Sequence, residues 1–296
     1  MKLAPIVLFT YKRLDTLQQT VQAVQENYLA TDSDLYIFSD AAKGESDIGA
    51  VNEVRKYIHS IKGFKTITIY ESQLNKGLAS SIIEGVTDVL NIHETVIVLE
   101  DDLISSPNFL NYMNRSLDFY GAEDKVFAIS GYSIPIDSSS ESDVYFTSRS
   151  SSWGWATWKD RWVKIDWEIR DYSSFKNNNS LRHDFNKMGS DMSRMLDRQV
   201  QGKINSWAIR WCYHQFKNNL FSVYPLISKI KNVGFNSIDA SNTKEKFNPY
   251  QTKLDNGVKR EFQFSKDIDL DPKIIKQFTK PYSIISRIKF KIINWF

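Results

Sequence analysis

The chain has 296 residues, of which 42% are hydrophobic and 25% charged, and its formal net charge is only +3. This is the composition of a globular protein long enough for one large α/β domain, and the weak net charge gives no reason to expect a nucleic-acid partner. The single cysteine, Cys212, excludes a disulfide framework and favours a reducing compartment. The first apolar run is too short for a signal peptide, and none approaches the roughly 20 residues of a membrane-spanning helix, so we expect a cytoplasmic protein.

The first 130 residues alternate between two hydrophobic periods. Apolar runs typical of strands are followed by segments whose apolar residues recur every three or four positions, which predicts amphipathic helices. Such alternation predicts right-handed crossovers and a mostly parallel sheet flanked by helices. The predicted strands are 4–10, 34–40, 65–70, 95–102 and 126–133, and the predicted helices are 14–28, 51–61, 78–90 and 107–120.

The second half of the chain is less regular. Four tryptophans at partly helical spacing fall within residues 153–162, and a polar, mostly helical region follows to about residue 201. The later segments predict a helix at 204–219, one or two strands at 220–235, a loop at 236–260 and an amphipathic helix at the C-terminus.

Polar residues follow three of the predicted strands. These are Thr10 to Arg13, Ser39 with Asp40, and the acidic triplet Glu100, Asp101 and Asp102. Parallel strands end at one edge of the sheet, where α/β proteins bind their ligands. We therefore expect these three sets to share one site.

The acidic triplet has three interpretations. Its carboxylates could favour the N-terminus of the helix near Pro107, bind Mg²⁺ or Mn²⁺ together with substrate phosphates, or form an acid–base pair. A helix cap accounts for one acid better than for three, so we favour the metal–phosphate interpretation.

The ordered motifs IVLFTYKR, YIFSD, NKGLASSI, VIVLEDDL, GWATWKDRW and INSWAIRW resemble those of nucleotide-sugar glycosyltransferases of the GT-A fold. They are similar to bacterial family-2-type enzymes that build surface polysaccharides and to the animal N-acetylglucosaminyltransferases that initiate complex N-glycans. The resemblance covers roughly residues 4–240. It implies a twisted, mostly parallel sheet, with a nucleotide-sugar-binding half (1–130), an acceptor-binding half of the same domain (131–265) and a basic amphipathic C-terminal helix (266–296).

The resemblance also implies roles on the donor side. Asp102 would be the direct ligand of Mn²⁺ or Mg²⁺, Asp101 would face the metal shell or the ribose, and Glu100 would face the hydroxyls of the donor sugar. The other donor-binding residues would be Thr10, Arg13, Asp40, Asn75, Lys76 and Gly77, with Arg13 on the pyrophosphate or base and Asp40 on the base. Simpler interpretations remain open: a solvated Arg13, Asp40 in a turn, and Asn75 to Gly77 as a helix cap.

On the acceptor side, Trp153, Gly154 and Trp155 are expected to form a wall for a sugar, because a glycine between two rings suggests close approach of a ligand. The alternative is that these tryptophans belong to the core. Asn205, Ser206 and Trp207 complete the expected acceptor site.

The catalytic base is not evident. Related enzymes often carry an acid just before the tryptophan that here is Trp207, whereas this chain has Asn205 and Ser206. The candidates are Asp160, Asp166 and Asp239, unless a retaining route makes a base unnecessary. Relatives also often carry a histidine after the motif KNVGF that completes the metal shell, and this chain has none there.

The resemblance thus implies an inverting, metal-assisted hexosyl- or N-acetylhexosaminyltransferase. It would move a sugar from a UDP-linked donor to an oligosaccharide or lipid-linked acceptor during bacterial capsule or O-antigen synthesis, at the inner face of the cell membrane. The C-terminal helix would lie on the anionic membrane surface, or else pack on the domain. Two alternatives are a sugar-phosphate nucleotidyltransferase, which the lack of glycine in TYKRLDT disfavours, and a catalytically inactive carbohydrate-binding relative.

Overall fold

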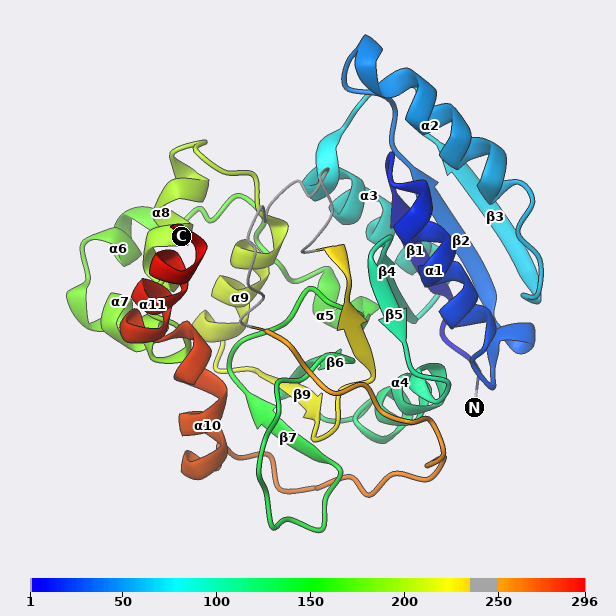
Figure 1. Cartoon of the computed structure of the whole chain (residues 1–296). Helices are drawn as coiled ribbons and strands as arrows, with labels where there is room; N and C mark the ends of the chain where they lie inside the picture. Colours follow the sequence, from blue (N-terminus) through cyan, green and yellow to red (C-terminus); the bar gives the residue numbers. More distant parts are fainter. Residues whose placement is uncertain (1, 235–249, 296) are drawn as a thin grey trace.

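A computed structural model describes residues 2–234 and 250–295. Its centre is an eight-stranded sheet in the order β3-β2-β1-β4-β8-β6-β9-β7 (Figure 1). Six strands run in one direction, and β8 and β7 run against them. The strands are β1 (Ile6–Thr10), β2 (Asp34–Ser39), β3 (Thr66–Glu71), β4 (Thr95–Glu100), β6 (Val126–Ser130), β7 (Val144–Thr147), β8 (Trp155–Trp158) and β9 (Phe221–Pro225), and β5 (Leu103–Ser105) pairs separately with β10 (Ile230–Asn232).

Helices cover both faces of the sheet, so the predicted mostly parallel α/β fold is confirmed. Strand β1 shows why its sequence is a continuous apolar run: Ile6 and Leu8 belong to the core on one face, and Val7 and Phe9 to the core on the other. The helices are α1 (Leu14–Gln25), α2 (Glu45–Ile58), α3 (Gly77–Ile92), α4 (Phe109–Phe119), α5 (Lys159–Trp162), α6 (Tyr172–Lys176), α7 (Asn179–Phe185), α8 (Met192–Val200), α9 (Trp207–Lys217), α10 (Pro272–Thr279) and α11 (Ile284–Trp295).

The tryptophan-rich segment contains a strand, although the spacing of its tryptophans is partly helical. Trp155 and Trp158 lie in β8, which pairs antiparallel with β4 on one side and β6 on the other. Because they are three residues apart in a strand, they point to opposite faces and join different cores. Strand pairing in the centre of the sheet decides the structure here, and only residues 159–162 are helical.

The C-terminal region contains two helices instead of the one expected over 266–296. Asp271 caps α10 by accepting a hydrogen bond from the Lys273 N–H at 2.7 Å, and Pro272 occupies its first turn. Ile274 and Phe278 are buried in the same core as β1. Helix α10 is therefore part of the domain.

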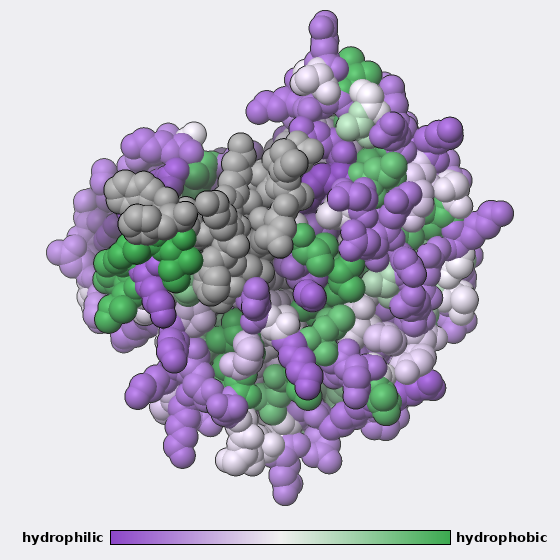
Figure 2. Space-filling model, in the orientation of Figure 1, coloured by the Kyte–Doolittle hydropathy of each residue, from purple (hydrophilic) through white to green (hydrophobic). Residues whose placement is uncertain are grey.

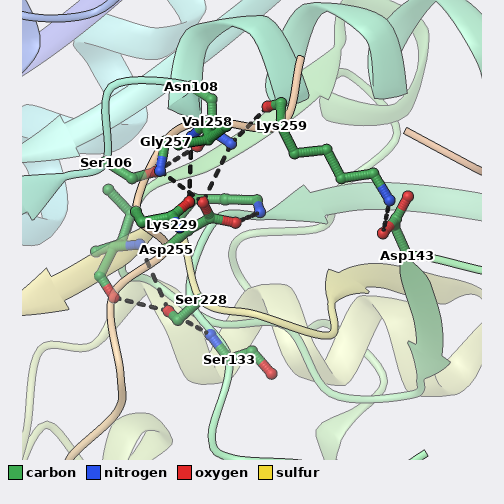
Figure 3. Close-up of polar contacts among 12 residues, drawn as sticks. Ser106, Asn108, Ser133, Asp143, Ser228, Lys229, Asp255, Gly257, Val258 and Lys259 are labelled. Atoms are coloured by element: carbon green, nitrogen blue, oxygen red, sulfur yellow. Dashed lines mark hydrogen bonds and ion pairs between the residues drawn. The ribbon is translucent and has the colours of Figure 1, made fainter. Parts of the chain in front are cut away.

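The segment between residue 250 and α10 returns across the molecule and is held by a buried polar cluster (Figure 3). Asp255 forms an ion pair with Lys229 and accepts hydrogen bonds from the Gly257 N–H (2.7 Å) and the Asn108 amide (3.3 Å). Asn108 also donates to the Lys259 carbonyl at 2.8 Å. The predicted loop at 236–260 is confirmed for residues 250–260, which contain no helix or strand, and its earlier part lies outside the described residues.

Across the described ranges 2–234 and 250–295, no helix combines the length and apolar character needed to cross a membrane.

Candidate functional site

A cavity of about 890 Å³ opens where β1 and β4 end, between these strands and helices α8 and α9. Arg13, Glu100 and Asp102 line it on the side of the strands. Trp153 and Trp207 line it on the side of the second half of the chain. The structure therefore brings together residues that the sequence assigned to the donor and acceptor sites.

Arg13 connects two of the three predicted acids. Its guanidinium forms an ion pair with Asp101 and another with Asp102 at 3.0 Å. Burial alone would lower the pKa of Arg13, but the Asp101 and Asp102 carboxylates hold it above its usual value. The arginine keeps its charge and holds both carboxylates at the end of β4.

Asp101 is buried below this pair and does not line the cavity. It accepts hydrogen bonds from the Thr10 hydroxyl at 3.4 Å and the Tyr11 N–H at 3.3 Å, in addition to its contact with Arg13. Burial raises the pKa of Asp101 to about 6, against the opposing effect of Arg13. Asp101 and Thr10 thus anchor the loop after β1, and neither lines the cavity.

Glu100 differs from its neighbours because no described donor is hydrogen-bonded to its carboxylate. Burial, with the nearby charges of Asp102 and Asp101, raises the pKa of Glu100 to about 8. An acid held in this way is suited to accept a cation or to hydrogen-bond a hydroxyl.

A glycine that the sequence analysis did not single out shapes the same corner. Gly234 follows β10, and a Cβ added to it would collide with the Asp102 carboxylate and come within 3.0 Å of Arg13 Nη1. The neighbouring Asn232 amide donates to Asp102 at 3.4 Å and accepts from the Gly234 N–H at 2.8 Å. A side chain at residue 234 would displace the Asp102 carboxylate from its observed position. The glycine in KNVGF was the available signal.

Asp40 lies at the end of β2 and has a clear structural partner. Its carboxylate accepts hydrogen bonds from the N–H groups of Ala41, Lys76 and Gly77 at 2.8–2.9 Å and from the Asn75 amide at 3.1 Å. Four donors occupy the lone pairs of its two oxygens. Asp40 therefore caps α3, and neither it nor residues 75–77 line the cavity.

The residues at the cavity suit a divalent cation that is completed by a ligand. Among the described residues no group of three or more acids, histidines or cysteines could hold a metal by itself. Mg²⁺ and Mn²⁺ sites on phosphate substrates usually need only one or two protein carboxylates, and Asp102 and Glu100 both face the cavity. The chemistry of this donor set fits a metal–diphosphate complex held mainly by Asp102, with Asp101 as a support instead of a ligand.

The expected aromatic wall is only partly formed. Trp153 packs edge-on against Tyr132, with ring centroids 4.6 Å apart, and against Tyr250 at 5.8 Å, and all three line the cavity. Trp155 instead lies in the core against Trp211, and a Cβ on Gly154 would lie 2.6 Å from Ile230. Gly154 permits close packing of the chain at a φ of +62°, so the expectation that it and Trp155 face a ligand is not met.

Asn205, Ser206 and Trp207 line the cavity where α9 begins. The Ser206 hydroxyl caps this helix by accepting from the Ile209 N–H at 3.3 Å. Asn205 accepts from Arg210 at 3.4 Å.

The positions of two base candidates argue against their role. Asp160 pairs with Arg161 beyond the end of β8, which runs against β4 and therefore ends at the opposite edge of the sheet. Asp166 accepts hydrogen bonds from the N–H groups of Glu168 and Arg170, and it too is absent from the cavity wall. Asp239 lies outside the described residues. The structure adds Asp191, a cavity residue at the start of α8 that the sequence analysis missed.

No protein-family model and no curated protein matches this chain. Among solved structures it is similar to the mannosyltransferase PcManGT from Pyrobaculum calidifontis in complex with GDP-Man and Mn²⁺, with 13% identity over 53% of this chain and 44% of that one and a TM-score of 0.36. It is also similar to S. aureus TarS residues 1–349, alone (10% identity, 57% and 49% of the two chains, TM-score 0.35) and in complex with UDP-GlcNAc (12%, 44% and 34%, TM-score 0.32). The matched part spans less than half of each of these proteins, and likeness at this level carries no argument about donor, acceptor or reaction.

Proposed function

We propose that this protein is a glycosyltransferase that uses a nucleotide-sugar donor and a divalent cation. The observation that carries the proposal is the convergence of Glu100, Asp102 and Arg13 with an aromatic wall in one cavity at the carboxyl edge of the sheet. Carboxylates and an arginine suit a metal-bound diphosphate, and aromatic rings suit the apolar faces of a sugar.

In the proposed reaction, the bond between the sugar's anomeric carbon and the diphosphate breaks as a bond to an acceptor hydroxyl oxygen forms. The hydroxyl proton passes to a base, and the bonding electrons leave with the diphosphate. A bound Mn²⁺ or Mg²⁺ would supply Lewis-acid stabilisation of this leaving group. Arg13 holds Asp102 in place and adds positive charge, and Glu100 orients the sugar hydroxyls.

The base is proposed among carboxylates on the acceptor side. Asp191 faces the cavity, and Asp239 stays a prediction from the sequence. An inverting course needs one of them as proton acceptor.

The finer assignments are also proposals. We infer a UDP-linked hexose or N-acetylhexosamine donor and an oligosaccharide or lipid-linked acceptor of a bacterial surface polysaccharide. The resemblance of the ordered motifs to surface-polysaccharide enzymes supports this assignment.

We further propose that α11 attaches the protein to the anionic cytoplasmic face of the membrane. Ile284, Ile285 and Ile288 are each more than half exposed, and Figure 2 shows an apolar patch where Figure 1 places α11. Exposed Lys289 supplies positive charge beside them. An apolar face bordered by basic residues is typical of helices that lie on anionic lipid.

The decisive experiment titrates the protein with UDP-linked and GDP-linked sugars in the presence and absence of Mn²⁺. We expect Mn²⁺-dependent binding and turnover that Asp102→Ala abolishes. Asp160→Asn, which removes a carboxylate remote from the cavity, is the matched control and should behave like the unmodified protein. Equal turnover by Asp102→Ala and Asp160→Asn would contradict the proposal.

A further inference from the structure

One wall of the cavity is strongly basic. Its five cationic residues come from the end of β7, from α8 and the loop after it, and from α11, and we call them the basic wall: Arg149, Arg194, Arg198, Lys203 and Arg287. Figure 1 shows α8 and α11 on the side of the molecule away from β1 and β4. The basic wall therefore faces the acidic corner of Glu100 and Asp102 from the second half of the chain.

The positive charge of this wall is poorly compensated. Among the residues that the structure describes, the one carboxylate lining this wall is Asp191, 3.5 Å from Arg149, beside five cations. The whole chain, by contrast, has a net charge of only +3. Within the described ranges, Arg194, Arg198 and Lys203 have no acidic partner. Arg287 donates to the Ser190 hydroxyl at 3.3 Å.

Arg149 is fixed in position at the inner end of the wall. Its guanidinium donates to the Met188 carbonyl at 3.1 Å and lies 4.0 Å from the centre of the Tyr282 ring. A Cβ on Gly189 would collide with it, so the chain is shaped to pass beside this side chain. A cation whose side chain is only 16% exposed, with one carboxylate near it, favours an anion in the cavity.

The two arginines of α8 also favour an anionic ligand. Arg194 and Arg198 are four residues apart, so they lie on one helix face and repel each other. The acid of the same helix, Asp197, pairs with Arg182 at 2.7 Å and does not relieve this repulsion. A solvated surface would more often alternate charges, whereas an anionic ligand would stabilise both arginines.

We propose that the basic wall binds a phosphate group carried by the acceptor. This inference rests on the proposed glycosyl transfer, which assigns the donor diphosphate to the corner of Arg13 and Asp102 and leaves the opposite wall to the acceptor. Trp153, Tyr132 and Tyr250 also line the cavity and can contact the acceptor sugar. Such a phosphate can belong to a lipid-linked acceptor or to a water-soluble sugar phosphate.

The test measures binding of inorganic pyrophosphate by calorimetry without metal. We expect the triple variant Arg194→Gln, Arg198→Gln, Lys203→Gln to bind pyrophosphate roughly tenfold or more weakly. Each lost charge contact is worth a fraction of the ~1.4 kcal/mol that corresponds to a factor of ten, and the variant loses three of them. The control removes three exposed lysines outside the cavity (Lys62→Gln, Lys65→Gln, Lys176→Gln) and should bind as the unmodified protein does. Unchanged pyrophosphate affinity in the triple variant would overturn the inference. So would a loss of pyrophosphate affinity that occurs only in Arg13→Gln, on the opposite side of the cavity.

A parallel titration with UDP and Mn²⁺ separates this inference from the proposed function. If the unmodified protein binds no UDP or GDP, the glycosyltransferase proposal fails, and the phosphate assignment to an acceptor fails with it. The glycosyltransferase proposal and the basic-wall inference are both supported by one combined result. In it, nucleotide binds equally to the unmodified protein and the triple variant, and pyrophosphate binding is lost only in the variant.

Two further probes distinguish the sources of the phosphate. Vesicles of phosphatidylcholine with phosphatidic acid should retain the triple variant more weakly than the lysine control variant if the phosphate is lipid-linked. If it is not, α11, which both variants keep, should hold the two equally. If it is water-soluble, glucose 1-phosphate should bind in solution, and only the triple variant should lose it. Failure of both probes to bind through the basic wall would count against a phosphate-bearing acceptor.

Discussion

The surroundings of Glu100 oppose the ionisation of its carboxyl group. Its pKa of about 8 arises first from burial and then from the adjacent charges of Asp102 and Asp101. The unfolded chain releases this proton near pH 4.5, so between these values the folded state binds the proton more tightly. Ionised Glu100 therefore costs stability progressively as the pH rises, and the full cost is present above pH 8.

The loss of stability on ionisation of Glu100 gives a pH-dependent prediction. Glu100→Gln should melt at about the same temperature as the unmodified protein near pH 4.5. By pH 9 it should be more stable by about 1 kcal/mol or more, or roughly 2–4 °C. Melting curves between pH 4.5 and 9 measure this difference, with the exposed helix variant Glu53→Gln as control. A difference that does not grow with pH would contradict the assignment.

Gly234 gives a second prediction at this scale. Gly234→Ala places a methyl group where the Asp102 carboxylate lies, and that flexible side chain can move aside. We expect the affinity for metal and nucleotide to fall about tenfold while the free energy of unfolding changes by less than about 1 kcal/mol. Calorimetric titration and thermal unfolding of the same samples measure both quantities. Gly44→Ala, at a glycine with no atom within 4 Å of the added Cβ, is the control.

Among the elements, the return segment around Asp255 depends on one buried ion pair. Burial lowers the pKa of Lys229, and its contact with Asp255 opposes that effect. Both side chains are at least 93% buried, since their exposed fractions are 5% and 7%. The pair connects the segment before α10 to β10 and the start of α4 (Figure 3).

Asp255→Asn should therefore be strongly destabilising. Removing one partner of a buried pair leaves the other charge uncompensated and costs about 3–5 kcal/mol. Glu261→Gln breaks the exposed pair with Arg115 and should cost less than about 1 kcal/mol. Denaturant unfolding of the two variants measures the contrast, and similar losses would show that the Asp255 cluster is not a structural anchor.

For the whole molecule, one sheet joins the two halves that the resemblance distinguishes. Strand β8 lies between β4 of the first half and β6, and a single core includes residues from Ala4 to Phe278. The site depends on this union, because Glu100 and Asp102 come from the first half, whereas Asp191 and the basic wall come from later parts of the chain.

A shared core predicts cooperative unfolding. All eight tryptophans follow residue 152, and Trp155 and Trp158 lie in β8 beside β4. Tryptophan fluorescence therefore reports on the second half and its junction with the first, whereas far-ultraviolet circular dichroism reports on the whole chain. We expect the two signals to give coincident urea unfolding curves, as in two-state behaviour. Separate midpoints would show that residues 1–130 unfold independently.

The alternating pattern of the first 130 residues was enough to predict β1 to β4, their helices and the edge at which Glu100 and Asp102 meet Arg13. Local periodicity carries that information, because buried parallel strands are apolar throughout and the helices between them are amphipathic. The tertiary structure alone decided which of these side chains face the cavity: Asp101 and Asp40 are occupied by neighbouring donors, and Trp155 is buried by strand pairing. It also assembled the basic wall and placed Gly234 over Asp102, since these residues are far apart in the chain and no local pattern records which distant segments pack together.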